Sequence, residues 1–304
     1  YLREKRSVIY VRDALQDEAT IQSNAEEYLR EHDGSDYKKA VHSLEEAYEL
    51  LDTSDGSGNI IICGKFCLQT TSQIPACHGT VYWSSLWGDM DYRKNEENPA
   101  YLYLYGKSDS YISLESNLTL QNMDICYEKT NMTGIDANGY RLCIGTDIGT
   151  EVREEQIADV RISPAVDGKM GSAEPENFYV IGAGFCSGQV EDIHIALYNT
   201  EIGGLIILYG NVTVGSETQS ADVEVIVRDT NIVQKEYSIS RDLDGNLCSS
   251  QIYGRLTVSE ELYSRNLEFV EVSGGTFTEI TDSAIRNYIN KTESAKQLSC
   301  QKFR

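Results

Sequence analysis

The chain has 304 residues, and its 48 acidic residues outnumber 26 Lys and Arg, so the formal net charge is -22. This charge disfavours nucleic acid and anionic membrane surfaces as partners and favours cations. No apolar run approaches the ~20 residues that a membrane-spanning helix needs, so we expect no membrane insertion. The 20 Tyr against 6 Phe are typical of a β-rich protein whose aromatic rings keep a polar edge for solvent or sugars.

Residues 35–66 predict an amphipathic helix followed by a turn and a buried strand. Ser35 or Asp36 is a suitable N-cap, and we expect the helix over residues 36–51. Residues 60–63 form an uninterrupted apolar run, which is typical of a strand buried on both faces. The apolar face of the helix has residues at three- and four-residue steps, namely Val41, Leu44, Tyr48 and Leu51.

The rest of the chain reads as a series of short strands. An early strand is expected at residues 8–11, followed by a charged, weakly helical excursion at residues 14–30. The end of the chain, residues 282–304, is expected to form a helical cap or tail. A helix ahead of many strands predicts a cap over the open end of a β-solenoid. The further expected strands lie at residues 100–105, 111–116, 118–128, 139–148, 159–162 and 178–185.

An internal repeat indicates that the strands stack. Residues 192–202 (DIHIALYNTEI) align without gaps on residues 222–232 (DVEVIVRDTNI), with apolar residues at alternate positions. A repeat of this length corresponds to one coil, or slightly more, of a right-handed parallel β-helix. The alternative is a β-sandwich, but two-residue hairpin turns are nearly absent, and Asn138 with Gly139 is the one good candidate. We therefore predict an all-β fold, a right-handed parallel β-helix (solenoid).

Several motifs are spread over residues 35–277: AVHSLEEAYELL followed by GSGNIIICG, then WSSLWGDMDYR, LTLQNMDI, ANGYRLCIG, FYVIGAGF and GGTF. They resemble the right-handed β-helix regions, of pectin-lyase-like architecture, in large surface proteins of gut-dwelling Gram-positive bacteria. The resemblance implies adhesion or glycan contact more than a defined reaction. Two features depart from such proteins, because cysteine is more plentiful here and residues 14–30 replace a compact Gly- and Asp-rich opening.

These observations divide the chain into three expected regions. Residues 1–34 hold a strand and the charged surface excursion, residues 35–281 form the β-helix with its N-terminal cap helix, and residues 282–304 form the C-terminal cap or tail. The first residue is Tyr1, so we expect the chain to be a piece of a longer protein.

Residues 82–93 (YWSSLWGDMDYR) are the strongest candidate for a ligand site. They contain both tryptophans of the chain, and Asp89, Asp91 and Arg93 share one side if the segment is extended. Such a segment suits a sugar, whose CH groups stack on aromatic rings while its hydroxyls bond to charged groups. The alternative is structural, with Trp83 in the core and Arg93 bound to Asp91. The expected ligand-binding residues are Tyr82, Trp83, Trp87, Asp89, Asp91, Tyr92 and Arg93.

Catalysis is the alternative role for this segment. A β-helix polysaccharide lyase would need Ca²⁺ on several carboxylates plus a Lys or Arg base, and a glycoside hydrolase would need two carboxylates across a cleft. Asp89, Asp91 and Arg93 contain these residue types, although a chain this acidic produces such triplets often. The histidines match no catalytic pattern; they are His32, His42, His78 and His194.

We expect no cofactor, and Ca²⁺, as an adventitious or structural ion, is the metal that the sequence leaves open. Zinc is the less favoured metal, because Cys63 of the cluster that also includes Cys67, Cys77 and His78 lies in a buried run. The Ca²⁺ candidates lie in turns that lack the distal Glu of an EF-hand loop and need no ion to form, namely Asp52, Asp55, Asp136, Asn138, Asp242 and Asp244.

Eight cysteines are scattered along the chain. Cys67 and Cys77 flank a polar loop and form the predicted disulfide. Cys63, Cys126 and Cys143 lie inside apolar strand patterns, where we expect small core residues and no bridges.

The sequence thus predicts a non-catalytic, extracellular β-helix module of a cell-surface protein. We expect a stalk or adhesin that binds a polysaccharide, a host or cell-surface glycan, or a protein partner on a lateral face. The alternative is a polysaccharide-degrading β-helix enzyme, a lyase or glycoside hydrolase, that acts through Asp89, Asp91 and Arg93. A purely architectural role would predict no glycan binding.

Overall fold

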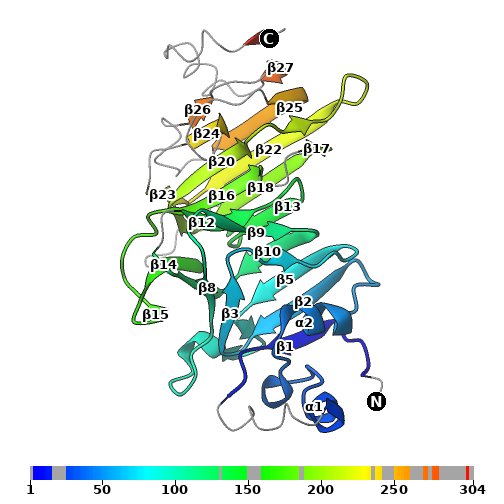
Figure 1. Ribbon diagram of the computed structural model, residues 1–304, viewed down its shortest axis with the longest axis vertical. Helices are drawn as coiled ribbons and strands as arrows, with labels where there is room; N and C mark the ends of the chain where they lie inside the picture. Colours follow the sequence, from blue (N-terminus) through cyan, green and yellow to red (C-terminus); the bar gives the residue numbers. More distant parts are fainter. Residues whose placement is uncertain are drawn as a thin grey trace.

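The protein is built from three sheets whose strands are mainly parallel (Figure 1). The computed structural model describes residues 3–15, 25–129, 132–148, 159–184, 188–233, 237–241, 250–260, 270–272, 276–280 and 299–300. In these ranges the sheets have twelve, seven and five strands, and two further strand pairs lie beside them. The fold is therefore mostly β, as predicted, and the parallel pairing contradicts the alternative of an antiparallel β-sandwich.

The chain enters the three sheets in turn, and each visit adds a strand parallel to the previous one. The first visit uses β2 (Ser57–Ile62) in the twelve-stranded sheet, β3 (Lys65–Gln69) in the five-stranded sheet and β4 (Gln73–Ile74) in the seven-stranded sheet. The second uses β5 (Thr80–Ser84), β8 (Tyr101–Tyr105) and β9 (Ser110–Leu114) in the same order. The third uses β10 (Asn117–Gln121), β11 (Met123–Tyr127) and β12 (Thr133–Asp136).

Later strands extend the same sheets. The five-stranded sheet gains β14 (Val160–Val166) and β15 (Lys169–Met170), and β19 (Glu201–Ile202) pairs with β23 (Asn231–Ile232). The seven-stranded sheet gains β16 (Phe178–Ala183), β20 (Gly204–Tyr209), β24 (Tyr237–Arg241) and β26 (Val270–Val272). The twelve-stranded sheet gains β13 (Arg141–Ile144), β17 (Gln189–Val190), β18 (Ile193–Tyr198), β21 (Thr213–Val214), β22 (Ala221–Arg228), β25 (Gln251–Glu260), β27 (Thr276–Ile280) and β28 (Ser299–Cys300).

The core is filled by alternate side chains of each strand. In β22, Val223, Val225 and Val227 are at most 1% exposed, because successive side chains of a strand point to opposite faces. β18 lies beside β22 in the register that the repeat indicates, with Ile193 opposite Val223 and Leu197 opposite Val227. The two copies of the sequence repeat are therefore neighbours in the sheet, and their apolar residues stack.

Residues with left-handed backbone turn the chain out of the twelve-stranded sheet. Asn122 (φ 47), Asn199 (φ 41) and Asp229 (φ 49) directly follow β10, β18 and β22. Asn and Asp adopt this conformation more readily than other residues that carry a Cβ atom. The single strand predicted over residues 118–128 is therefore wrong, because Asn122 divides it into β10 and β11, which lie in different sheets.

The N-terminal end of the core is covered by β1 (Val8–Val11) and by α2 (Leu44–Leu50) (Figure 1). β1 pairs with β2, so residues 60–62 lie inside the sheet and are 0% exposed, as predicted for a buried strand. On its other side β1 is bridged by Val41, which pairs with Val11, and Leu51 forms a bridge with Arg6 just ahead of β1. The side chains of α2 that join the core are Leu44, Ala47, Tyr48 and Leu50.

The helix predicted over residues 36–51 is wrong in its extent. Asp36 caps only a 3₁₀ helix, η2 (Tyr37–Lys39). Val41 is extended and pairs with β1, and α2 begins after Ser43, whose Oγ accepts a backbone N–H of the first turn at 3.2 Å. The pairing of Val41 with β1 thus interrupts a segment whose apolar spacing alone indicates a continuous helix.

Among the described strands, two antiparallel pairs interrupt the parallel order. β6 (Leu86–Trp87) and β7 (Met90–Asp91) are antiparallel, as are the ends of β14 and β15. The second hairpin turns at Asp167 and Gly168, which both have positive φ and which the sequence analysis did not identify as a hairpin turn. The predicted candidate, Asn138 with Gly139, joins β12 to β13 and therefore connects two different sheets.

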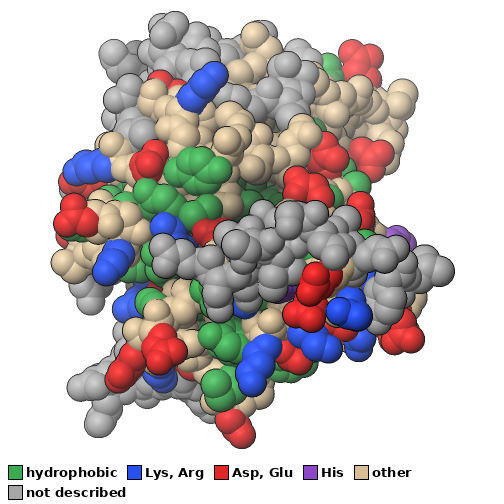
Figure 2. Space-filling model, turned by 60° about the horizontal axis from the view of Figure 1, so that its bottom comes forward, with side chains coloured by type: hydrophobic (Ala, Val, Ile, Leu, Met, Phe, Trp, Pro, Cys, Tyr) green, Lys and Arg blue, Asp and Glu red, His purple; other side chains and the backbone are tan. Residues whose placement is uncertain are grey.

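The remaining predictions concern the ends of the chain and its surface. The predicted C-terminal helix lies outside the described residues, except that Ser299–Cys300 form the strand β28. Of the excursion at residues 14–30, the described part includes α1 (Ala25–Glu31). No helix in the described ranges is long and apolar enough to cross a membrane. Figure 2 shows Lys and Arg side chains interspersed with Asp and Glu on the face that it presents.

Candidate functional site

The segment that the sequence identifies as a ligand site folds into the β6–β7 hairpin and a short 3₁₀ helix, η3 (Tyr92–Lys94). Asp89 lies in the two-residue hairpin turn after Gly88, so the segment is not extended there. The expectation that Asp89, Asp91 and Arg93 share one side of a strand is therefore wrong. The hairpin instead exposes Trp87 and Met90, which are 41% and 58% accessible.

Asp91 is held in an ion pair with Arg93. Its Oδ1 accepts from Arg93 Nε at 2.9 Å, and its Oδ2 accepts from Arg93 Nη2 at 3.1 Å. Lys94 Nζ lies 3.3 Å from Oδ2 of the same carboxylate. Burial alone would raise the pKa of Asp91, but the hydrogen bonds and charges of Arg93 and Lys94 outweigh it and lower this pKa. Asp91 therefore stays ionised and is bound to Arg93, which is the structural role that the sequence offered as the alternative to ligand binding.

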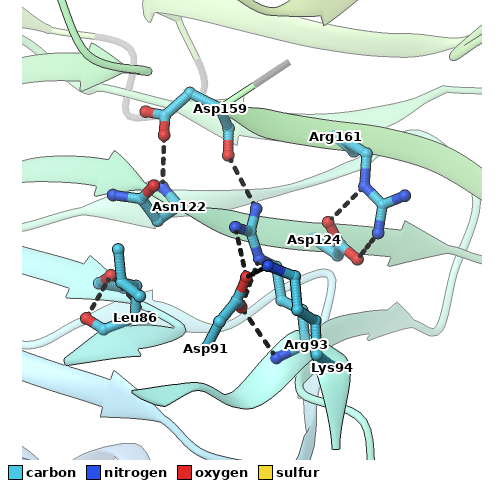
Figure 3. A network of polar contacts seen from close by, with 9 residues as sticks. Leu86, Asp91, Arg93, Lys94, Asn122, Asp124, Asp159 and Arg161 are labelled. Carbon is cyan, nitrogen blue, oxygen red and sulfur yellow. Dashed lines mark hydrogen bonds and ion pairs between the residues drawn. The ribbon is translucent and has the colours of Figure 1, made fainter. Parts of the chain in front are cut away.

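Arg93 also connects the hairpin to the strands above it (Figure 3). Its Nη1 donates to the backbone carbonyl of Asp159 at 3.4 Å. The Asp159 carboxylate accepts from the backbone N–H of Asn122 at 3.1 Å and from Thr146 Oγ1 at 2.8 Å. These contacts tie the hairpin to residues just before β11 and β14.

A second ion pair lies beside the first in Figure 3. Arg161 on β14 donates from Nε to Oδ1 of Asp124 on β11 at 2.8 Å, and from Nη2 to Oδ2. The hydrogen bond and charge of Asp124 raise the pKa of Arg161. The three carboxylates of this network, Asp91, Asp124 and Asp159, each accept two or more hydrogen bonds. The oxygens of these carboxylates are therefore occupied by donors of the protein, and Asp91, whose pKa is lowered, is ionised, whereas a general acid needs a protonated carboxyl group.

The other aromatic residues that were predicted to bind a ligand differ in how far they are exposed to solvent. Trp83 is 1% exposed in the core, in agreement with the structural alternative. Tyr92 is buried at 8%, with its ring centroid 6.1 Å from that of Tyr10 and 6.0 Å from that of Tyr37. Tyr82 lies on the outer face of β5 and is partly exposed. Of the predicted aromatic residues, only Trp87 and Tyr82 are thus accessible.

The five-stranded sheet carries an aromatic surface that is not among the predicted site residues. The strand β8 reads YLYLY, so Leu102 and Leu104 enter the core while three tyrosines point outward. The rings of Tyr103 and Tyr105 are partly exposed and nearly parallel, with an interplanar angle of 17° and centroids 6.3 Å apart. Tyr101 is 7% exposed, and its hydroxyl donates to the carbonyl of Gly168 at 3.2 Å. The alternation of tyrosine and leucine in β8 is the signal that could have revealed this surface.

Charged groups surround these rings. Lys65 Nζ lies 4.5 Å from the ring centroid of Tyr103. The hydroxyl of Tyr103 donates to Glu128 Oε1 at 3.3 Å, while Glu128 Oε2 accepts from the backbone N–H of Gly106 at 3.1 Å. Burial and the charge of Glu128 raise the pKa of Tyr103 to about 12, so its phenol stays protonated and donates at neutral pH. We name the surface formed by Lys65, Tyr101, Tyr103, Tyr105 and Glu128 the tyrosine face.

The predicted Ca²⁺ positions serve as turns in the described residues. Asp52 Oδ1 accepts from the N–H of Ser54 at 3.0 Å, and Asp136 Oδ1 accepts from the N–H of Asn138 at 2.9 Å. Asp55 lies in an exposed turn, and residues 242 and 244 lie outside the described ranges. No group of three or more His, Cys, Asp or Glu side chains among the described residues is arranged to hold a metal, and this includes the zinc candidates.

The predicted disulfide is wrong, because Cys67 and Cys77 are free thiols. Cys67 lies on β3, where its N–H donates to Asp13 at 3.0 Å, whereas Cys77 follows β4 of another sheet and packs against the core. Cys63 and Cys126 are buried and unbridged, as predicted, while Cys143 is unbridged but only partly buried. Burial raises the pKa of Cys126 to about 11, which keeps this thiol protonated and unreactive.

The fold and the site define a mostly β protein of stacked parallel strands, with an ion-pair network and a tyrosine face on the outside of one sheet. No protein-family model matches the chain, and neither a curated protein nor a solved structure is significantly similar to it.

Proposed function

We propose that this chain is a non-catalytic, extracellular module of a cell-surface protein, a stalk or adhesin that binds glycan on a lateral face. In this proposal the three sheets form the sides of a right-handed parallel β-helix of pectin-lyase-like architecture. The order in which the chain enters the sheets supports this fold, because β2 to β12 add one parallel strand to each of the three sheets in three successive rounds. The outer face of the five-stranded sheet is then a lateral surface of the solenoid.

The observation that carries the proposal is the stacked pair Tyr103 and Tyr105. Two partly exposed rings, nearly parallel and on one strand, offer a continuous apolar platform for the CH groups of a pyranose. A polar group lies at its margin, where Glu128 offers an acceptor to sugar hydroxyls. The platform thus combines stacking with hydrogen bonding, which is the combination that sugar recognition requires.

The test is binding to a panel of oligosaccharides, measured by calorimetry on the wild-type chain and on Tyr105→Ala. We expect the variant to bind the selected glycan roughly two- to tenfold more weakly, because one ring of the platform is lost. Tyr140→Ala is the matched control, since Tyr140 is 38% exposed but lies outside the tyrosine face. Equal losses in both variants, or no glycan binding by the wild type, would count against the proposal; the second result would leave a purely architectural role.

Turnover is the outcome that favours the enzymatic alternative. The same panel is incubated with the protein, with and without Ca²⁺, and examined for new reducing ends or unsaturated products. We expect none, because Asp91 is ionised and paired with Arg93. Products that disappear in Asp91→Asn would overturn the non-catalytic proposal, and binding that is lost in Trp87→Ala but kept in Tyr105→Ala would move the site to the β6–β7 hairpin.

A further inference from the structure

The tyrosine face already holds a positive charge. Lys65 Nζ is 4.5 Å from the ring centroid of Tyr103 and 6.0 Å from that of Tyr101. Both distances are within the range of cation–π attraction, in which an ammonium group lies against the negative face of an aromatic ring. The rings are therefore arranged to accept a cation.

Lys65 forms no ion pair with a carboxylate in the described part of the chain. The neighbouring acids are engaged elsewhere: Glu128 accepts from Tyr103, Asp13 accepts from the backbone of Cys67, and Asp124 is paired with Arg161. The ammonium is thus held by the rings, through a contact that is weak at exposed sites. Its flexible four-carbon stem can move it aside at little cost.

The net charge of the protein also favours the binding of a cation at the tyrosine face. The chain carries a formal charge of -22, which attracts cations to its surface and repels anions. Glu128 is exposed beside the rings, and its charge remains when Tyr103 donates a hydrogen bond to it. A ligand that brings a positive charge to this face therefore gains both from the rings and from the carboxylate.

We infer that the tyrosine face selects glycans that contain protonated amino sugars, and that Lys65 occupies the place of the ligand's amine when no ligand is bound. This inference rests on the proposed glycan binding at the same face and names the class of sugar. The amine of the ligand takes the position over Tyr103, the sugar ring lies against Tyr105, and Lys65 moves away. Lys65 is thus an internal competitor of the ligand.

The experiment compares two oligosaccharides of equal length, one of glucosamine and one of N-acetylglucosamine, which differ in the charge of the nitrogen. Calorimetry is done at about pH 6, where an amine whose pKa is near the roughly 7.7 of an α-amino group is protonated. We expect the wild-type chain to bind the glucosamine oligosaccharide at least roughly threefold more tightly. Lys65→Gln removes the competitor and strengthens this binding by roughly three- to tenfold, without strengthening that of the N-acetylated ligand.

Three further variants complete the design. Lys38→Gln changes the net charge equally, but Lys38 is an exposed residue of η2 that forms no cation–π contact with the rings in the ranges that the structure describes, and its substitution is expected to strengthen binding little. Lys65→Arg keeps a cation over the rings and is expected to bind like the wild type. If Lys65→Gln does not fold, Glu128→Gln serves instead, and it should weaken binding of the glucosamine oligosaccharide alone. Equal thermal unfolding midpoints show that each variant retains the fold.

The outcomes separate the inference from the proposed function. Tighter binding of the N-acetylated ligand, or weaker binding of glucosamine oligosaccharide by Lys65→Gln, would overturn the inference while leaving glycan binding intact. Binding of neither ligand, together with binding of another glycan that depends on Tyr105, would also overturn only the inference. If the wild type binds no glycan at all, both fail.

Discussion

Asp124 and Arg161 lie opposite each other on the neighbouring parallel strands β11 and β14, 37 residues apart in the chain. The side chain of Asp124 is 5% exposed, whereas that of Arg161 is 53% exposed, so the guanidinium covers a buried carboxylate and faces solvent itself. A carboxylate buried to this degree requires a partner. The pair therefore fastens two successive strands of the sheet that carries the tyrosine face.

Arg161→Met is expected to destabilise the protein, because it leaves the Asp124 carboxylate buried without its cation. We expect the free energy of unfolding, measured with urea, to fall by about 1–3 kcal/mol. Arg141→Met is the control, since Arg141 is exposed on another sheet, and its effect should stay within about 0.5 kcal/mol. The double variant Arg161→Met with Asp124→Asn should recover part of the loss. Equal effects of the two single variants would show that the pair is not stabilising.

The lowered pKa of Asp91 predicts a pH dependence of stability. The folded chain holds this carboxylate charged more strongly than the unfolded chain does, so its contribution is complete above the unfolded pKa of about 3.9 and is lost as the pH falls through the lower, folded pKa. We expect the difference in unfolding free energy between the wild type and Asp91→Asn to be constant near neutral pH and to shrink below about pH 4. Urea unfolding of both proteins at a series of pH values measures this difference in free energy. A difference that grows on acidification would contradict the ion pair.

Substitutions at Asn122 test the turn between β10 and β11. The residue has φ 47, a left-handed conformation that glycine adopts freely and that costs a residue with a Cβ atom about 1–2 kcal/mol. We expect Asn122→Gly to be nearly neutral, Asn122→Ala to cost about 1 kcal/mol and Asn122→Val to cost more, because valine is β-branched. Thermal unfolding of the three variants gives the order. The reverse order would show that residue 122 does not make this turn.

Two serines distinguish the observed start of α2 from the predicted one. Ser43 Oγ accepts the N–H of Glu46 at 3.2 Å, so Ser43→Ala should lower the free energy of unfolding by about 1 kcal/mol. Ser35 is a candidate cap on sequence alone but lies ahead of η2, and Ser35→Ala should cost no more than about 0.5 kcal/mol. Urea unfolding of both variants measures the difference. A larger effect at Ser35 would favour the long helix that the structure contradicts.

The local hydrophobic pattern predicted much of the fold. Residues 8–11 form the expected early strand, the apolar run at residues 60–62 is a buried strand, and the two copies of the alternating repeat pair in the register of their alignment. The division of residues 118–128 into two strands also has a signal in the sequence. In this stretch, the side chains that face the core have even residue numbers up to Leu120, and from Met123 onward they have odd numbers. The turn at Asn122 displaces the alternation by one residue.

The candidate site was predicted only in part. The ion pair of Asp91 with Arg93 was weighed as the structural alternative, since the two residues are neighbours in the chain. The contact of Arg93 with Asp159 joins residues 66 positions apart, and no local pattern indicates it. The tyrosine face was missed as a site, although the alternation in β8 already placed its three rings on one side.

The sequence by itself determined that the chain is mostly strand and which side chains of each strand face the core, because this alternation follows from the period of two in an extended backbone. The tertiary structure decided which strands are neighbours, and therefore that Asp124 meets Arg161 and that Lys65 lies over Tyr103. The lengths of the turns and of the two inserted hairpins set this stacking. Contacts between successive strands depend on those lengths, which local hydrophobicity does not encode.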